Sequence, residues 1–142
     1  MVARVLLMVL IASSLACGGS SPSAPSPTPS APYSQTDLVV GTGAEAVTGK
    51  TVTINYTGWL YSDTGTDHKG TQIGTSAGGA PFSFVIGGGG AIRGIDQGVT
   101  GMKVGGQRRL VIPPELAYGS QGNGSIPANA TLVFDVELMS VQ

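Results

Sequence analysis

The chain has few of the residues from which most catalytic centres are built. Its 142 residues include one cysteine and one histidine, charged residues make up 11%, and the formal net charge is -1. One histidine and one cysteine cannot supply the ligands of a usual zinc site. His68 lies in a Gly-, Asp- and Thr-rich stretch, which does not suit a serine–histidine–aspartate unit. Arg108 and Arg109 fall within an alternating strand pattern, where we interpret one or both as solvated edge residues rather than a basic patch. We therefore expect no metal site and no nucleic-acid partner.

Two glycine-rich runs also lack the surroundings of a cofactor site. Residues 41–46 match a dinucleotide-binding fingerprint by their letters, but a strand pattern rather than a helix follows them. Residues 87–90 lack the lysine and the hydroxyl residue of a phosphate loop. We interpret both runs as turns and expect no cofactor.

The first 17 residues are predicted to be an export signal. Arg4 precedes an apolar run over residues 5–12, and small residues typical of a cleavage zone follow. The run is shorter than the roughly 20 residues of a membrane span. Residues 14–18 (Ser-Leu-Ala-Cys-Gly) resemble the cleavage box of bacterial lipoproteins, although that box usually has leucine where Ser14 stands. We expect export to the cell envelope and a membrane anchor through a lipid on Cys17. The alternative is a plain secretory signal with an incidental cysteine.

A tether is predicted over residues 18–36. Residues 18–32 are Gly, Ser, Pro, Ala and Thr, with no charge and no large apolar side chain. Such a segment cannot bury enough surface to offset its ordering entropy, so we expect disorder. Alternating prolines bias it toward an extended, semi-stiff chain. The folded domain is therefore expected to occupy residues 37–142.

This domain carries several strand patterns and one helical pattern. Apolar and polar residues alternate, as in half-buried strands, over residues 51–60, 82–86, 107–112 and 131–141, and residues 37–40 are a shorter strand candidate. Apolar residues recur at helical spacing at Ile92, Ile95, Val99 and Met102. Three glycines within that stretch limit the helix to about two or three turns. We predict an α+β fold in which an antiparallel β-sheet wraps on one short α-helix, with a ligand groove between them.

Among enzymes, these residues favour a reaction that needs neither a nucleophile nor an acid–base pair. Isomerisation of an X–Pro bond is such a reaction, because its barrier of about 18–20 kcal/mol arises from amide resonance and no covalent bond changes. A site needs only to fit the twisted imide better than either planar form. An apolar pocket helps because it desolvates the carbonyl, whose polarity falls as resonance is lost. A binding module is the other class left open.

Seven segments then resemble, in order, the FKBP family of peptidyl-prolyl cis–trans isomerases. They are residues 52–58, 69–71, 81–84, 91–99, 101–105, 112–119 and 126–138. Together they cover nearly all of the chain after the tether. The resemblance implies an FKBP-like fold and isomerase activity on proline-containing polypeptide clients.

The resemblance also implies a role for individual residues. Tyr56, Phe82 and Phe134 match aromatic walls of the pocket. The Ile92 N–H matches a donor to the bound backbone, and the Tyr118 hydroxyl matches a group that reaches a substrate carbonyl. These five residues are the predicted catalytic set.

Five further positions are expected to contact the substrate: Ile73, Phe84, Ala91, Ile95 and Ile126. Two of these positions depart from the family pattern. Ile73-Gly74 stands where the family usually has Phe-Asp, which removes an aromatic wall and a carboxylate that supports the polar network of the pocket. Ile95 replaces the tryptophan that commonly floors it. The resemblance therefore implies an intact fold with reduced isomerase activity and weak macrolide binding.

Two other functions stay open at this point. One is a non-catalytic binding or chaperone domain that keeps the same scaffold for proline-containing or unfolded clients. The other is an adhesion or structural β-domain, in which the matched pocket residues would have no common purpose. Neither a heptad repeat nor a long apolar edge strand is visible, so we expect a monomer.

Overall fold

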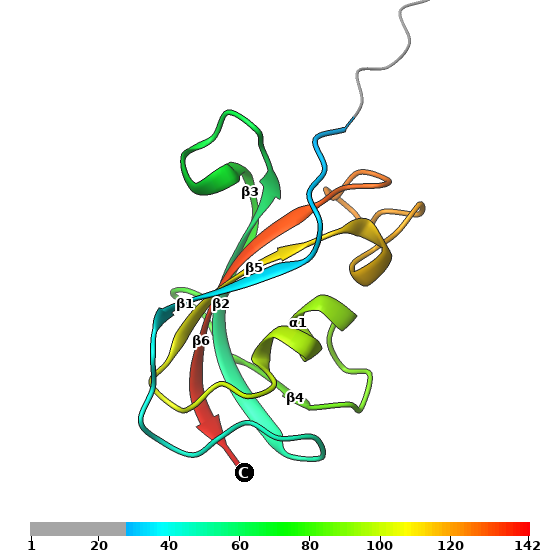
Figure 1. Ribbon diagram of the computed structural model, residues 1–142. Coiled ribbons are helices and arrows are strands. Elements are labelled where there is room, and N and C mark those ends of the chain that lie inside the picture. Colours follow the sequence, from blue (N-terminus) through cyan, green and yellow to red (C-terminus); the bar gives the residue numbers. More distant parts are fainter. Residues whose placement is uncertain (1–27) are drawn as a thin grey trace, which may run out of the picture.

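The computed structural model of the protein describes residues 28–142, so the predicted export signal, Cys17 and the first part of the predicted tether lie outside it. Its strands form one antiparallel sheet in the order β1-β5-β6-β2-β3, and β4 pairs with β2 beside this path (Figure 1). The strands are β1 (Ser34–Val39), β2 (Thr51–Tyr61), β3 (Lys69–Thr75), β4 (Phe82–Val85), β5 (Gln107–Ile112) and β6 (Leu132–Val141). The helices are α1 (Arg93–Val99) and the 3₁₀ turns η1 (Thr66–His68) and η2 (Pro114–Leu116). The predicted α+β architecture is confirmed.

One edge of β2 changes its partner half-way along the strand. Residues 51–54 pair with β4 and residues 57–61 pair with β3, while β6 pairs with the other edge along nearly its whole length. Between the two partners, Ser76 forms two hydrogen bonds with the backbone of Tyr56. The Tyr56 N–H donates to Ser76 Oγ at 2.9 Å, and the Ser76 N–H donates to the Tyr56 carbonyl at 2.9 Å. The position of Tyr56 is thereby fixed where the sheet edge divides.

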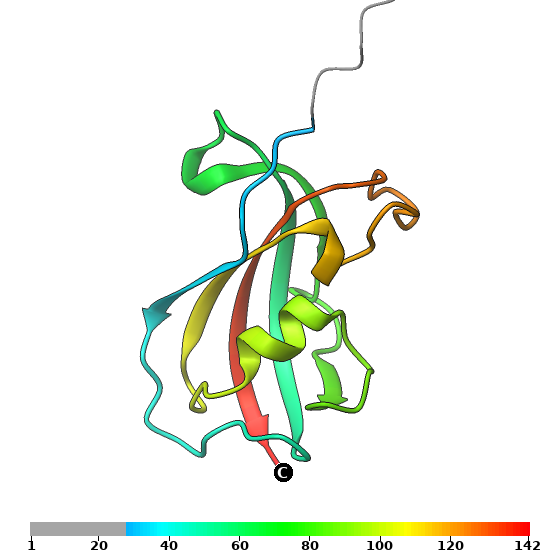
Figure 2. The same cartoon turned by 45° about the vertical axis from the view of Figure 1, so that its right-hand side comes forward.

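Helix α1 lies across one face of the sheet (Figure 2). Its buried face includes two glycines one turn apart, Gly94 and Gly98. A Cβ at Gly94 would overlap the side chain of Ile112, and a Cβ at Gly98 would overlap that of Leu110. The glycines that weaken the helix as an isolated segment therefore allow its backbone to rest directly on β5.

The core fills the space between α1 and the sheet. Alternate residues of the long strands point into it, as the alternating sequence patterns predicted, and meet Ile95 and Val99 of the helix. Its fully buried large side chains include Val52, Ile54, Ile86, Leu110, Ile112, Leu132, Val136 and Leu138.

Of the two arginines, of which one or both were expected to be solvated, Arg108 is buried, with 9% of its surface exposed. Its Nε donates to Asp37 Oδ1 at 2.6 Å, and its Nη1 donates to the carbonyl of Gly98 at 2.8 Å. A buried guanidinium is tolerated when its donors are satisfied in this way. Arg108 thus ties the C-terminal end of α1 to β5 and, through Asp37, to β1.

Two parts of the sheet differ from the sequence prediction. β3 was not predicted, because Gly70 and Gly74 interrupt the pattern and Ile73 is its one large apolar residue. β1 begins at Ser34, so residues 34–36 pair with β5 although they were assigned to the tether. Every residue of β1 is exposed, and an edge strand of this kind leaves no hydrophobic alternation to detect. Within residues 28–142, no helix is both long and apolar enough to cross a membrane.

The contact between α1 and β5 predicts that Gly98→Ala destabilises the domain. On an exposed helix this substitution stabilises by about 1 kcal/mol, but here the added methyl overlaps Leu110, and overpacking costs about 1–3 kcal/mol. Urea unfolding of the purified domain measures the free energy of unfolding. Gln97→Ala, at an exposed position of the same helix, is the matched control and should change stability by less than about 0.5 kcal/mol. A Gly98→Ala protein as stable as wild type would contradict the direct packing of backbone on sheet.

Candidate functional site

A pocket of about 460 Å³ opens beside α1 on the helix-covered side of the sheet. All five residues of the predicted catalytic set line it, and so do four of the five predicted substrate contacts. Its lining is Tyr56, Ile73, Gly74, Phe82, Gly89, Gly90, Ala91, Ile92, Ile95, Tyr118, Ile126 and Phe134. Segments far apart in the sequence therefore converge on one site, where the resemblance placed it.

Three aromatic rings from three strands form the inner wall. Tyr56 of β2 meets Phe82 of β4 edge to face, with 6.3 Å between ring centroids and 83° between planes. Tyr56 also contacts Phe134 of β6, at 6.0 Å and 59°. Gly58 lies opposite Phe134 in the β2–β6 register, and a Cβ there would overlap the phenyl ring. The glycine two residues after Tyr56 therefore makes room for the Phe134 ring.

Phe84 is the predicted site residue that the pocket does not include. It is 5% exposed, and its ring stacks behind that of Phe82 at 5.5 Å between centroids. Residues 82 and 84 face the same side of the short strand β4, but Phe84 points deeper into the core. The pocket lining therefore does not include Phe84, and its contact with the substrate stays a prediction. Its ring contacts that of Phe82, which it supports from behind.

The floor and rim come from α1 and the loops around it. Ile95 of α1 lies at the floor and is 6% exposed. Ile92 directly precedes the helix; its carbonyl accepts from the Ile95 N–H at 3.1 Å, and no group in residues 28–142 accepts a hydrogen bond from its own N–H. That N–H is therefore available to a ligand. Tyr118 and Ile126 form the opposite rim, on the loop that follows η2 (Figure 2).

Several residues that shape the site were missed by the sequence reasoning. Gly89 and Gly90, interpreted only as turn residues, line the pocket. Their loop is held against α1 by Asp96, whose carboxylate accepts the Gly87 N–H at 2.9 and 3.2 Å. Ser76 fixes the backbone of Tyr56. The glycine run directly before Ala91 was a usable signal, whereas nothing in the sequence marks Ser76.

No charged side chain lines this pocket. Hydroxyl groups of Tyr56 and Tyr118 are present, and neither makes a hydrogen bond within the part of the chain that the structure describes. Nor do the described residues contain a group of three or more His, Cys, Asp or Glu side chains that could hold a metal ion. The site can therefore offer apolar walls, aromatic faces and a few neutral donors.

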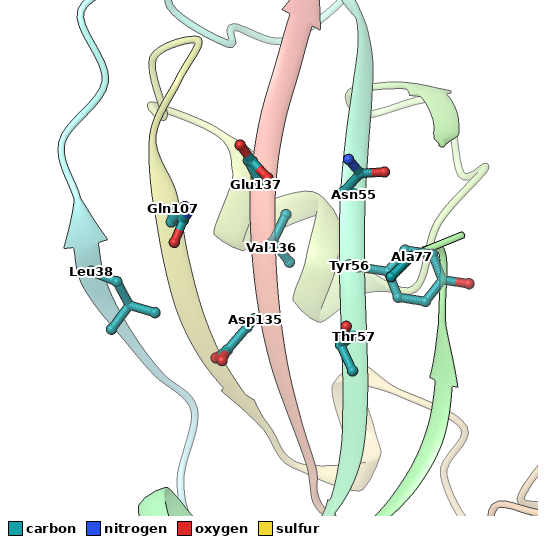
Figure 3. Close-up of a pocket in the computed structure, with 9 residues that line it drawn as sticks. All are labelled: Leu38, Asn55, Tyr56, Thr57, Ala77, Gln107, Asp135, Val136 and Glu137. Atoms are coloured by element: carbon teal, nitrogen blue, oxygen red, sulfur yellow. The ribbon is translucent and has the colours of Figure 1, made fainter. Parts of the chain in front are cut away.

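A second hollow, of about 260 Å³, lies on the opposite face of the sheet (Figure 3). Asp135 is its central charge, and this carboxylate is already paired: it accepts from Lys69 Nζ at 2.6 Å and from Arg109 at 2.7 and 3.0 Å. Arg109 also pairs with Asp67 at 3.1 Å. The hollow is thus part of an ion-paired outer surface and presents no unpaired Asp135 to a ligand.

Comparison with known proteins connects this site with one family. The family model described as FKBP-type peptidyl-prolyl cis-trans isomerase matches residues 43–139. The FK506-binding protein of Neisseria meningitidis serogroup A is 46% identical over 106 residues, covering 74% of this chain and 92% of that protein. Peptidyl-prolyl cis-trans isomerase FKBP16-4, chloroplastic, of Arabidopsis thaliana is 44% identical over 110 residues. The chain spans only 46% of the latter and 23% of FK506-binding protein 3 of Candida albicans.

Solved structures agree with the fold. FkpA from Escherichia coli has a TM-score of 0.66 and 40% identity, with 81% of this chain and 50% of that chain covered. AtFKBP13 has a TM-score of 0.66 and 37% identity, with 78% and 93% covered.

The Asp135 ion pairs predict a pH dependence of stability. Burial alone would raise the pKa of Asp135, but hydrogen bonds from Arg109 and Lys69 outweigh it and hold the pKa below its ordinary value of 3.8. The unfolded chain then binds the proton more readily than the native protein, so the stabilisation is present above about pH 5 and is lost as pH falls through the lowered native pKa.

Asp135→Asn should therefore cost about 1–2 kcal/mol at pH 7, and its difference from wild type should shrink between about pH 5 and pH 2. Urea unfolding across this range measures both effects. Glu137→Gln, on the same face of β6 and outside the ion pairs of residues 28–142, is the control and should leave the pH profile nearly unchanged. A constant difference for Asp135→Asn would refute the lowered pKa.

Proposed function

Because the chain belongs to the family of FKBP-type peptidyl-prolyl cis–trans isomerases, we propose that its folded domain catalyses the cis–trans isomerisation of X–Pro bonds in exported polypeptides. One observation carries the proposal: the five side chains of the predicted catalytic set, from five separate segments, meet in a single pocket without charge. Such a site suits a reaction in which no proton moves and the polarity of the reacting carbonyl falls.

The geometry supports different roles for the residues of the pocket. The rings of Tyr56, Phe82 and Phe134 enclose the space for a proline ring. The Ile92 N–H and the Tyr118 hydroxyl are donors for carbonyl groups of the client. By desolvating the imide and holding its flanking backbone, the pocket stabilises the twisted form over both planar forms. A barrier lowered by about 4–8 kcal/mol corresponds to an acceleration of roughly 10³–10⁶.

We propose that the rate is lower than in family members with the full motif. Ile73 and Ile95 line the pocket where the family usually places aromatic rings, and Gly74 lines it where the family has an aspartate. A Cβ at Gly74 would meet nothing within 4 Å, so the missing carboxylate leaves space rather than a filled contact. The Tyr56 hydroxyl has no partner within residues 28–142 to fix its direction. When the pocket groups are less fixed, part of the entropy cost of ordering them is incurred during each turnover.

The same departures favour one alternative, a domain that binds proline-containing or unfolded clients without accelerating isomerisation. Binding needs the apolar walls, whereas catalysis needs the donors placed on the twisted imide. Tyr118→Phe separates the two, because it removes a donor and keeps the ring. If clients bind equally well to both proteins and no turnover is measurable in either, the binding function is correct.

We predict that Ile73→Phe combined with Gly74→Asp raises kcat/KM by about threefold or more, a barrier change of at least 0.6 kcal/mol. The phenyl ring restores an aromatic wall, and the carboxylate supplies an acceptor in a space that Gly74 leaves open. A protease-coupled assay on a proline tetrapeptide measures the rate, with Tyr118→Phe as the variant expected to lose turnover.

Thr71→Asp, at an exposed position of the same strand outside the pocket, controls for the added charge and should leave the rate unchanged. Wild-type activity equal to that of a full-motif relative would refute the reduced rate. No activity in any of the proteins would refute the enzymatic function.

We further propose that the domain is exported and held at a membrane by a lipid on Cys17. The apolar run of residues 5–12, the small residues before Cys17 and the proline-rich segment after it support this arrangement. A tether of that composition would keep the domain clear of the bilayer. Slow X–Pro isomerisation, over tens to hundreds of seconds, limits the folding of many proteins, so a client-folding role at the cell envelope follows.

Mass spectrometry of the native N-terminus tests the anchor. We expect a mature chain that begins at Cys17 and carries acyl groups, recovered in the membrane fraction. Cys17→Ser should lack the acyl mass and leave that fraction. Cleavage at another bond, or an unmodified cysteine, would overturn lipidation while leaving the proposed isomerase activity untouched.

A further inference from the structure

A third hollow of about 360 Å³ adjoins the pocket. This hollow, called the groove extension below, is lined by Gly87, Gly89, Ala91, Arg93, Asp96 and Gln97. It shares Gly89 and Ala91 with the pocket. A polypeptide whose X–Pro bond occupies the pocket can therefore reach the extension across these two residues, of which Gly89 has no side chain and Ala91 has only a methyl group.

The glycine loop keeps this passage open. A Cβ at Gly89 would meet nothing within 4 Å, and Gly89 has a φ of +79°, which L side chains rarely adopt. The floor at this point is therefore bare backbone. A floor of this kind suits the backbone of an extended client, because it offers peptide groups and no steric block.

Arg93 brings the one positive charge to this groove. It is exposed at the start of α1 and takes part in no ion pair of residues 28–142. Asp96, the other charged residue of the extension, accepts the Gly87 N–H with both carboxylate oxygens, at 2.9 and 3.2 Å. The pocket itself carries no charge. A client side chain that reaches the extension thus meets a guanidinium that no ion pair engages, beside a carboxylate whose oxygens already accept the Gly87 N–H.

We propose that Arg93 and the groove extension form a subsite for an acidic client side chain, so that the domain prefers X–Pro bonds with Asp or Glu a few residues away. This inference rests on the proposed isomerase function and specifies its substrates. A carboxylate and a guanidinium at a partly exposed site gain up to about 1 kcal/mol, which corresponds to a preference of about two- to fivefold. Added salt should reduce it, because the pair is screened.

The test uses proline peptides that differ in one residue, Glu, Gln or Lys, placed at each of four positions before and after the X–Pro bond. Cis–trans exchange measured by NMR exchange spectroscopy avoids a coupling protease with its own charge preference. In wild type we expect one position at which Glu exceeds Lys by about two- to fivefold in kcat/KM, and a smaller ratio in 0.5 M salt. Arg93→Gln should remove the preference, and Arg93→Glu should reverse it.

Two further variants make the result specific. Gln97→Lys adds a second cation to the extension and should increase the Glu preference. Lys103→Gln makes the same change of charge as Arg93→Gln at an exposed residue outside both hollows, and should leave the preference as it is in wild type. Unfolding curves of each variant verify that the fold is retained.

The outcomes separate this inference from the function on which it rests. Turnover of all peptides with no charge preference, or with a preference that survives Arg93→Gln, overturns the subsite and leaves the isomerase function standing. If no peptide is turned over, the isomerase function fails. Chemical-shift titrations of the same peptides then decide the subsite by whether Glu peptides bind more tightly than Lys peptides in wild type and equally in Arg93→Gln.

Discussion

The close contact between α1 and the sheet is the constraint on which the rest of the molecule depends. Gly94 and Gly98 carry no side chains, so the helix backbone rests on Leu110 and Ile112 of β5. Arg108 then joins the end of the helix to the same strand. The two contacts act together, because the guanidinium can reach the Gly98 carbonyl only if the helix lies this near to the sheet. A side chain at either glycine would push the helix outward and lengthen that bond.

The pocket inherits its shape from this contact. One wall belongs to the sheet, through Tyr56 and Phe134, and the opposite side belongs to the beginning of α1, through Ile92 and Ile95. The width of the pocket is therefore set by how far the helix stands from the strands. Asp96 also fixes the glycine loop relative to α1, because its carboxylate accepts a hydrogen bond from the Gly87 N–H. A reaction that depends on fit rather than on reactive groups needs such control more than it needs any single side chain.

Much of this arrangement could be predicted from the sequence. The alternation of apolar residues in β2, β5 and β6 reflects burial of one face, which the hydrophobic effect enforces and which therefore leaves a pattern. The matched motifs located the residues that line the pocket, whereas the depth of Phe84 could not be predicted, because sequence position does not say how deep a side chain points. The burial of Arg108 could not be predicted, because the Gly98 carbonyl and the Asp37 carboxylate come within its reach only once the helix has docked and β1 has joined the sheet. The strand β3 and the role of Ser76 were not predicted for a related reason: hydrogen bonds to backbone groups require no particular side-chain pattern.

The attachment of β1 at the edge of the sheet has a mechanical consequence. The chain enters the sheet at Ser34, which pairs with Val111, and β1 has no second neighbour in the sheet. A pulling force that arrives through the N-terminal segment would load these backbone pairs one after another, as in opening a zipper. The Asp37–Arg108 ion pair lies near the far end of that strand and resists its complete detachment. Moderate tension would thus be absorbed by β1 while the pocket, which contains no residue of that strand, keeps its form.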